Sequence, residues 1–216
     1  MSFDRFAKAY HQNAHFQRQI AGQLASQVEA AGLGLDLGAG TGFVGQALAT
    51  RNFIEVDRSA AMLACSSHSA KIVATAEALP FRNDCFDWVV SSLALQWMGQ
   101  TDELLRVLRP GGRYYAAIVL PESLPELAHA RRRIGLNTVT QLPQVQHWQA
   151  QLPGQHRIET VELAFDSPRE ALASVRDIGA GGSSHGSLSR AQHRQLLDAL
   201  GRSLTYQILW IQGVCE

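Results

Sequence analysis

The chain has 216 residues, 46% of them hydrophobic, and its 19 basic and 19 acidic residues cancel to a formal net charge of zero. This length suits one domain with a sizeable core, and the balanced charge gives no sign of a nucleic-acid or membrane partner. Cys65, Cys85 and Cys215 are few and far apart, which argues against a disulfide framework or a cysteine-rich zinc site. We therefore expect a single domain over 1–216, a monomer, and a cytoplasmic location.

The N-terminal segment, residues 1–30, is predicted to be helical. Phe16, Ile20, Leu24 and Val28 recur every four residues, which is the spacing of an apolar stripe on one helix face. The first predicted strand, 33–37, follows this helix.

The strand stops at the turn Gly38-Ala39-Gly40-Thr41-Gly42, and a helix-like segment, 43–51, comes directly after it. Glycine lets the backbone bend sharply and lets a ligand come close, because it has no side chain and tolerates positive φ. A strand, a glycine turn and a helix in this order are typical of the nucleotide-like cofactor site of an open α/β sheet.

Two cofactors compete for this turn. Residues 40–45 match the G-x-G-x-x-G pattern of dinucleotide sites, whereas 38–42, preceded by Asp36, match the shorter turn that binds S-adenosyl-L-methionine (SAM). The dinucleotide pattern would begin two residues late, and an acid at this point suits a sulfonium better than a pyrophosphate. We predict SAM, held by Asp36, Gly38, Gly40 and Gly42; a glycine turn without a ligand is the alternative.

The second predicted strand, 53–57, ends in an acid, Asp57, about 20 residues after the turn, where a carboxylate can bind ribose hydroxyls. Its alternative role is a helix cap. Ser59 is expected to cap a short helix. Met62 in that helix is expected to pack on adenine, or else to belong to the core.

Strands and helices continue to alternate, which indicates a parallel sheet with right-handed crossovers. Residues 77–81 follow the third strand and are expected to line the adenine edge, and Ser91 ends the fourth strand at the same edge of the sheet. A leucine-rich helix ends before a turn at 109–112. Residues 121–150 have helical pieces but no clear strand, so we expect a lid or insertion there. The other predicted elements are strands at 71–74, 86–91, 113–119, 157–165 and 204–214, and helices capped by Ser167 and Ser189.

Four segments together resemble class I SAM-dependent methyltransferases: the glycine turn, 56–63, 78–81 and 108–112. This resemblance implies a Rossmann-like α/β fold. Its sheet would have seven mostly parallel strands with one antiparallel, flanked by helices and carrying a helical lid.

A narrower resemblance runs along nearly the whole chain. It is to the malonyl-acyl-carrier-protein O-methyltransferase family of biotin synthesis, and its segments are 6–10, 17–19, 93–97, 122–127, 177–180 and 204–206. Members methylate the free carboxylate of a malonyl thioester, which masks its charge so that fatty-acid enzymes can extend the chain. Where the wider family often has an acid, this chain has Thr75, so the resemblance implies that the Thr75 hydroxyl or the backbone near Ala76 meets the adenine amino group.

Methylation of a carboxylate requires few catalytic groups from the protein. A carboxylic acid with a pKa near 4 is already ionised at neutral pH, so we predict no general base. The chain must align donor and acceptor and exclude water. No ligand set for a metal is evident beyond His11 and His15, and we predict no metal site.

Several residues are candidates for binding the acceptor. Arg176 is our first candidate for the carboxylate, and Tyr10 the second; Gln96 and Trp97 are expected to form the floor. Arg18 is expected to pair with the methionyl carboxylate of SAM. The alternative interpretation is that the arginines are solvated on the surface and that the aromatic residues belong to the core.

Arg131, Arg132 and Arg133 form the densest basic cluster and are expected to dock an acidic carrier protein; a solvated helix face is the alternative. We expect malonyl-acyl carrier protein or malonyl-CoA as the acceptor. Three other functions stay open: a methyltransferase for another small acid or a quinone precursor, a SAM-binding relative without catalysis, and a nicotinamide oxidoreductase.

Overall fold

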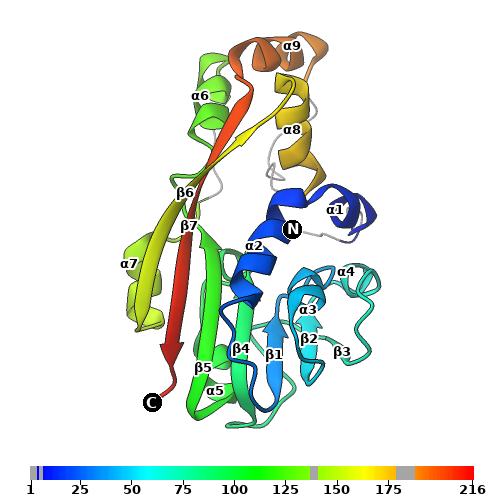
Figure 1. The fold of residues 1–216 in the computed structure, drawn as a ribbon. Helices are drawn as coiled ribbons and strands as arrows, with labels where there is room; N and C mark the ends of the chain where they lie inside the picture. Colours follow the sequence, from blue (N-terminus) through cyan, green and yellow to red (C-terminus); the bar gives the residue numbers. More distant parts are fainter. Residues whose placement is uncertain (1–3, 5–6, 137–140, 179–187) are drawn as a thin grey trace.

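The computed structural model describes residues 4, 7–136, 141–178 and 188–216. Their centre is a seven-stranded sheet in the order β3-β2-β1-β4-β5-β7-β6 (Figure 1). The strands are β1 (Gly34–Leu37), β2 (Phe53–Asp57), β3 (Lys71–Val73), β4 (Phe86–Ser92), β5 (Leu108–Val119), β6 (Gln155–Ala164) and β7 (Ser203–Val214).

The strand directions confirm the predicted fold class. The pairs β1–β2, β2–β3, β1–β4 and β4–β5 are parallel, while β7 is antiparallel to both of its neighbours, β5 and β6. A parallel pair requires a crossover connection, and helices supply several of these connections. The described helices are α1 (Ala7–Asn13), α2 (His15–Ala25), α3 (Phe43–Ala47), α4 (Ala60–Leu63), η2 (Leu95–Trp97), α5 (Asp102–Val107), α6 (Pro125–Arg133), α7 (Val145–Gln151), α8 (Pro168–Asp177) and α9 (Arg190–Ala199).

The core forms two clusters on opposite faces of the sheet. Along β5, Tyr115 and Ala117 belong to one cluster, and Tyr114, Ala116 and Ile118 belong to the other. Successive side chains of a strand point to opposite faces, so this strand is buried on both sides. The first cluster packs against α2, α6, α8 and α9, and the second against α5 and α7. Figure 1 shows α6, α8 and α9 gathered at one end of the molecule, where β6 and β7 extend.

Most predicted elements form within about two residues of their expected bounds, and both serine caps of the later helices are confirmed. Ser167 accepts from the backbone N–H of Glu170, and Ser189 and Gln192 form a reciprocal capping box. Ser59 likewise accepts from the N–H of Met62.

Three local expectations need correction. The leading helix breaks at Ala14 and ends at Ala25, so Val28 lies beyond it. The helix after the glycine turn ends at Ala47, because Leu48 is extended. The predicted turn at 109–112 lies inside β5, where Gly111 has a φ of 78° and the pairing register with β4 shifts. A positive-φ glycine lets the strand absorb this irregularity.

The segment 121–150 divides into two parts with different roles. Trp148 of α7 is fully buried in the second cluster. The same helix is fastened to the loop after η2, because His147 Nε2 lies 3.0 Å from the Gly99 carbonyl. α7 is therefore part of the core, and the expectation of a lid applies to α6. No helix in the described part of the chain is long and apolar enough to cross a membrane.

Candidate functional site

A cavity of about 480 Å³ opens at the carboxyl ends of β1, β2 and β4. One set of walls comes from residues 36–41, 43 and 44, the end of β2, and residues 74, 76 and 77, and we call it the sheet-edge half. The other set comes from residues 92–98 and 119–131, and we call it the α6 half. Side chains of α1 and α2 also reach the cavity, from Tyr10, Gln17 and Ala21. Ligands of open α/β sheets bind at this edge.

The glycine turn has a backbone geometry that favours glycine. Gly38, Gly40 and Gly42 have φ values of 75°, 55° and 80°. A Cβ atom on Gly38 would overlap the Cβ of Ala94. Gly38 and Gly40 line the cavity, whereas Gly42 is packed beneath the turn, against Ser66 and Glu55, outside the lining. The turn therefore offers a ligand its backbone at two of the three predicted glycines.

Asp57 joins the glycine turn to the end of β2. One carboxylate oxygen accepts from the N–H of Gly40 at 2.9 Å, and the other accepts from the N–H of Ser59 at 2.8 Å. Burial raises the pKa of Asp57, an effect that these two hydrogen bonds and nearby Arg58 oppose. A carboxylate oxygen has two lone-pair sites, so Asp57 can still accept ribose hydroxyls on the cavity side.

Asp36 is the least satisfied polar group of the cavity. Its side chain is fully buried, and neither carboxyl oxygen has a hydrogen-bond partner among the described residues. Burial raises the pKa of this carboxyl well above its usual range, and the nearby carboxyls of Glu55 and Asp57 raise it further. A buried, unpartnered acid beside a cavity calls for an explanation, and a cationic ligand provides one. The residues of the sheet-edge half therefore fit SAM, whose sulfonium and ammonium groups are cationic.

The wall predicted for adenine is formed by the neighbours of Thr75. Ala74, Ala76 and Glu77 line the cavity, and Met62 lines it with its Cε 3.4 Å from where a Cβ of Gly40 would lie. Thr75 is exposed and lies outside the lining. Thr75 is therefore not part of the described wall, and of the two sequence alternatives the geometry favours Ala76.

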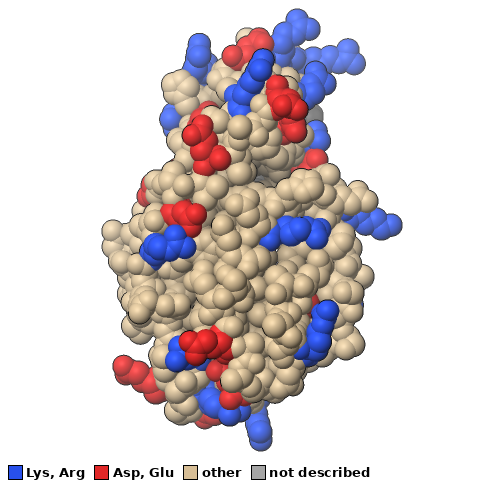
Figure 2. Space-filling view, viewed as in Figure 1, with Lys and Arg blue, Asp and Glu red and all other residues tan. Residues whose placement is uncertain are grey.

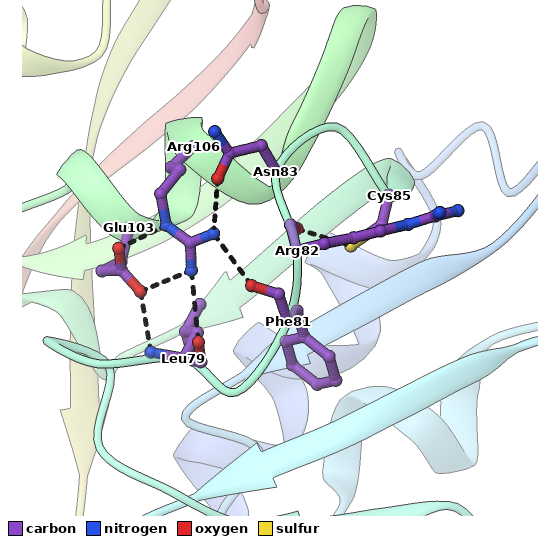
Figure 3. Close-up of polar contacts among 7 residues, drawn as sticks. All are labelled: Leu79, Phe81, Arg82, Asn83, Cys85, Glu103 and Arg106. Carbon is purple, nitrogen blue, oxygen red and sulfur yellow. Dashed lines mark hydrogen bonds and ion pairs between the residues drawn. The ribbon is translucent and has the colours of Figure 1, made fainter.

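A polar network fixes the loop that follows this wall (Figure 3). The guanidinium of Arg106 on α5 donates to Glu103 on the same helix and to the carbonyls of Leu79 and Phe81, at 3.2 and 2.8 Å. It also donates to Asn83 Oδ1 at 2.9 Å, and Glu103 in turn accepts from the N–H of Leu79 at 2.7 Å. Figure 3 shows the loop wrapped around this single side chain. Arg106 therefore holds the 79–83 loop, and with it the end of the cavity wall, against α5.

Besides Gly42 and Thr75, three predicted site residues do not line the cavity. Ser91 is buried and donates to the Leu37 carbonyl at 2.8 Å, so it ties β4 to β1. Arg18 lies over the Phe43 ring, 4.3 Å from its centroid, and donates to His11 and Gln46. Arg176 has a side chain that is 71% exposed, and it pairs with the adjacent Asp177. The sequence identified their elements correctly, but each side chain points away from the cavity.

The other predicted acceptor residues do line the cavity. Gln96 donates to the Leu93 carbonyl at 2.6 Å, which leaves its buried Oε1 without a partner among the described residues. Trp97 is 38% exposed beside it. Tyr10 stacks on Phe43 with ring centroids 5.8 Å apart. Burial and the nearby Asp57 raise the pKa of Tyr10.

The α6 wall was missed by sequence reasoning. Leu124, Leu127, Ala128 and Arg131 all line the cavity. Their spacing of three, four and seven residues is that of one helix face, and this periodicity could have revealed them. Leu124 begins the helix with a φ of 60°, a conformation that is uncommon outside glycine.

The start of α6 is held in place by hydrogen bonds with β7. The hydroxyl of Ser123 accepts from the N–H of Gln207 at 2.9 Å. Glu126 accepts from the N–H and hydroxyl of Thr205 at 3.0 and 2.5 Å. The 122–127 and 204–206 segments, far apart in the sequence, thus meet to position this wall.

Comparison with known proteins agrees with this geometry. The family described as "Methyltransferase domain" matches residues 35–116. The malonyl-[acyl-carrier protein] O-methyltransferase of Erwinia pyrifoliae is 33% identical over 240 residues, which cover 100% of this chain and 91% of the relative. The enzyme of the same name from Pseudescherichia vulneris is 33% identical over 246 residues, with 100% and 95% covered. The biotin biosynthesis bifunctional protein BioHC of Cellvibrio japonicus is 32% identical over 95% of this chain and 45% of its own length.

Solved structures show a similar fold. The YcgJ protein of Bacillus subtilis superposes with a TM-score of 0.63 at 19% identity, covering 93% of this chain and 98% of its own. A SAM-dependent methyltransferase of Thermotoga maritima gives a TM-score of 0.60 at 16% identity, with 99% and 98% covered. At these identities the likeness concerns the fold alone.

Proposed function

This chain belongs to the malonyl-[acyl-carrier protein] O-methyltransferase family, and we propose that it methylates the free carboxylate of a malonyl thioester on acyl carrier protein, an early step of biotin synthesis. The observation that carries the proposal is similarity above 30% identity along the full chain to relatives of that name. The protein is a SAM-dependent methyltransferase, and this excludes the nicotinamide alternative for the glycine turn.

SAM, when bound, supplies a methyl group activated by a positively charged sulfur. Four residues are proposed to hold it: Gly38 and Gly40 through their backbone, Asp57 through ribose hydroxyls, and Asp36 through its charge. Asp36 supports this role because it is buried, unpartnered in the described chain and directly on the cavity. The ionised carboxyl would complement the positive charge of the bound SAM.

The acceptor carboxylate needs no proton transfer before it attacks, because it is ionised at neutral pH. The described residues that line the cavity include no histidine, lysine or cysteine. The raised pKa of Tyr10 keeps its phenol protonated at neutral pH, so this residue supplies no phenolate as a base. We infer that the protein aligns the two reactants and excludes water. Alignment alone can lower a barrier by about 7–11 kcal/mol.

The apolar residues of the α6 half support the exclusion of water. Leu124, Leu127 and Ala128 face the cavity from α6, and Val119 and Leu120 face it from the end of β5. Removing water from the carboxylate strengthens its electrostatic interactions with the fixed groups of the site.

A carrier-docking role is proposed for the basic end of α6. Arg132 and Arg133 are exposed, whereas Arg131 lines the cavity, so two residues of the predicted cluster are available to a partner. Arg190 and Arg194 of the neighbouring α9 are also exposed. Figure 2 shows basic and acidic side chains intermixed at this end of the molecule. We expect alanine at both Arg132 and Arg133 to weaken carrier binding and to leave SAM binding intact; unchanged carrier affinity would contradict this role.

Methyl transfer from labelled SAM tests the proposed function. The acceptors to compare are malonyl-acyl carrier protein, malonyl-CoA, free malonate and a quinone precursor. We expect label on the malonyl thioesters first. Binding of SAM with label on none of them would refute the proposal.

A further inference from the structure

Arg131 is a cation set into the otherwise apolar α6 wall of the cavity. It lies on the same helix face as Leu124, Leu127 and Ala128, one turn beyond the last of them. Arg58 also lines the cavity, but it is exposed and belongs to the sheet-edge half, next to Asp57. Among the described lining residues, Arg131 is therefore the positive charge of the α6 half.

The guanidinium of Arg131 has no anion of its own in the described chain. Its Nε is buried without a hydrogen-bond partner. The ion pairs of the described residues use other arginines, namely Arg106, Arg109, Arg113, Arg157 and Arg176. Glu126, the acid of the same helix, is engaged by Thr205. Partial burial lowers the pKa of Arg131. A guanidinium in this setting can take an anionic ligand as its partner.

We propose that Arg131 binds the free carboxylate of the acceptor, so that the site selects the acceptor by the negative charge on its free end. This inference rests on the proposed function and names the residue that carries its acceptor specificity. A guanidinium fork can hold the plane of a carboxylate through two N–H donors and leave a lone pair on oxygen for the attack.

The same contact should favour release of the product. In the reaction a carboxylate oxygen forms a bond to the methyl carbon, the carbon–sulfur bond breaks, and its electron pair stays on sulfur. The carboxylate becomes a neutral ester, and the sulfonium becomes a neutral thioether. Arg131 then faces an ester without a charge, so the product should bind more weakly than the substrate.

The position of Arg131 is set by the sheet. α6 begins at the Ser123–Gln207 contact, and its first turn is fixed by Glu126 on Thr205 of β7. Arg131 lies on the same helix about one and a half turns beyond Glu126. A rigid placement of this kind is what a binding residue needs for alignment within a fraction of an ångström.

The test uses Arg131→Met, which keeps the apolar stem and removes the charge, and Arg131→Lys, which keeps the charge and removes the fork. Arg169→Met is the matched control, because Arg169 is exposed at the start of α8 and outside the cavity lining. The acceptor is malonyl-N-acetylcysteamine, a thioester that has the carboxylate but no phosphate. We expect KM to rise about 10- to 100-fold in Arg131→Met, less in Arg131→Lys, and not in Arg169→Met.

Two readouts separate this role from a structural one. SAM affinity should be unchanged in Arg131→Met, which shows that the fold and the sheet-edge half are intact. Wild-type protein loaded with S-adenosylhomocysteine should bind the malonyl thioester more tightly than its methyl ester, and Arg131→Met should lose this preference. An unchanged KM and preference in Arg131→Met would overturn the inference.

Other acceptors distinguish the remaining sources of negative charge. A loss seen with malonyl-CoA and malonyl-carrier protein but not with malonyl-N-acetylcysteamine would assign Arg131 to the phosphate of the pantetheine arm and overturn the inference. If wild-type protein methylates none of the three, the proposed function fails. The binding preference for acid over ester would still test Arg131 on its own.

Discussion

The two halves of the cavity are built in different ways. In the sheet-edge half, the ligand would meet backbone groups and short acids that lie within a few residues of two strand ends, such as Gly38, Gly40 and Asp57. In the α6 half, it would meet long side chains on a helix that a distant strand holds in place. The first half is rigid by local geometry, and the second depends on tertiary contacts. Substitutions in the first should therefore disturb SAM and the fold together, while those in the second should change the acceptor alone.

The largest effect is expected at Gly38. Alanine there would be strained at a φ of 75° and would overlap Ala94. We expect Gly38→Ala to lower the free energy of unfolding by about 2–4 kcal/mol and to abolish SAM binding. Urea unfolding and titration with S-adenosylhomocysteine measure both.

Gly111→Ala is the control for this substitution. Gly111 has a similar φ, 78°, but a Cβ there would meet nothing within 4 Å. Its cost should be the backbone strain alone, about 1–2 kcal/mol, with SAM binding preserved. Equal effects of the two variants would mean that close packing at the turn is unimportant.

The next largest effect is expected at Asp36, where the stability of the fold should depend on pH. Burial, Glu55 and Asp57 raise the Asp36 pKa, so the folded chain holds this proton more tightly than the unfolded chain. The resulting stability is fully present below the ordinary carboxyl pKa and is lost as pH rises toward the raised value. Asp36→Asn stays neutral and should remove this decline from the pH profile of unfolding.

SAM binding should respond in the opposite direction. The ionised carboxylate attracts the sulfonium, so affinity for SAM relative to neutral S-adenosylhomocysteine should rise with pH in the wild type. In Asp36→Asn this preference should fall about tenfold and become flat with pH. Asp166→Asn, at an exposed acid outside the cavity lining, should match the wild type. A preserved preference in Asp36→Asn would assign this acid a purely structural role.

A smaller loss of stability is expected when the polar network in Figure 3 is disrupted. Arg106→Met removes the side chain that binds Glu103 and the carbonyls of Leu79 and Phe81. We expect the free energy of unfolding to fall by about 1–3 kcal/mol, with a modest loss of SAM affinity as the 79–83 loop loosens. The hydrogen bond from Arg106 lowers the Glu103 pKa, so this stability is present above the ordinary carboxyl pKa and is lost as pH falls through the lowered value.

Arg82→Met serves as the comparison, because Arg82 lies in the same loop but is exposed. It should leave both stability and SAM affinity near those of the wild type. If the two arginine variants behave alike, the loop is held by its backbone and not by Arg106.

The smallest effect is expected at Arg176. Its side chain is exposed and paired with Asp177, away from the cavity. We expect Arg176→Met to change KM for the malonyl thioester by less than about twofold. Steady-state methyl transfer measures this KM. A tenfold rise in KM would show that Arg176 contributes to acceptor binding, as the sequence suggested.

The sequence predicts the sheet-edge half well because its chemistry is local. The glycine turn needs positive φ, Ser59 caps α4, and Asp57 lies at the end of β2. Each of these properties can be recognised within a few residues of sequence. The parallel order of the strands follows from their alternation with helices.

The α6 half could be predicted only in part, because it depends on which way each side chain points. Arg176 and Arg131 are both helix arginines beside apolar positions, and only the packing of α6 on β7 distinguishes them. Thr75 and Ser91 likewise differ from their lining neighbours by a single position along the strand end, and this one-residue step turns a side chain to the opposite face.

The most direct measurement is transfer of a labelled methyl group from SAM to malonyl-acyl carrier protein, with acetyl-acyl carrier protein as the matched acceptor that lacks a free carboxylate. We predict label on the malonyl form only, released by mild alkali as methanol, as expected for a methyl ester. Label on the acetyl form, or label that alkali does not release as methanol, would show that the cavity does not act on a carboxylate.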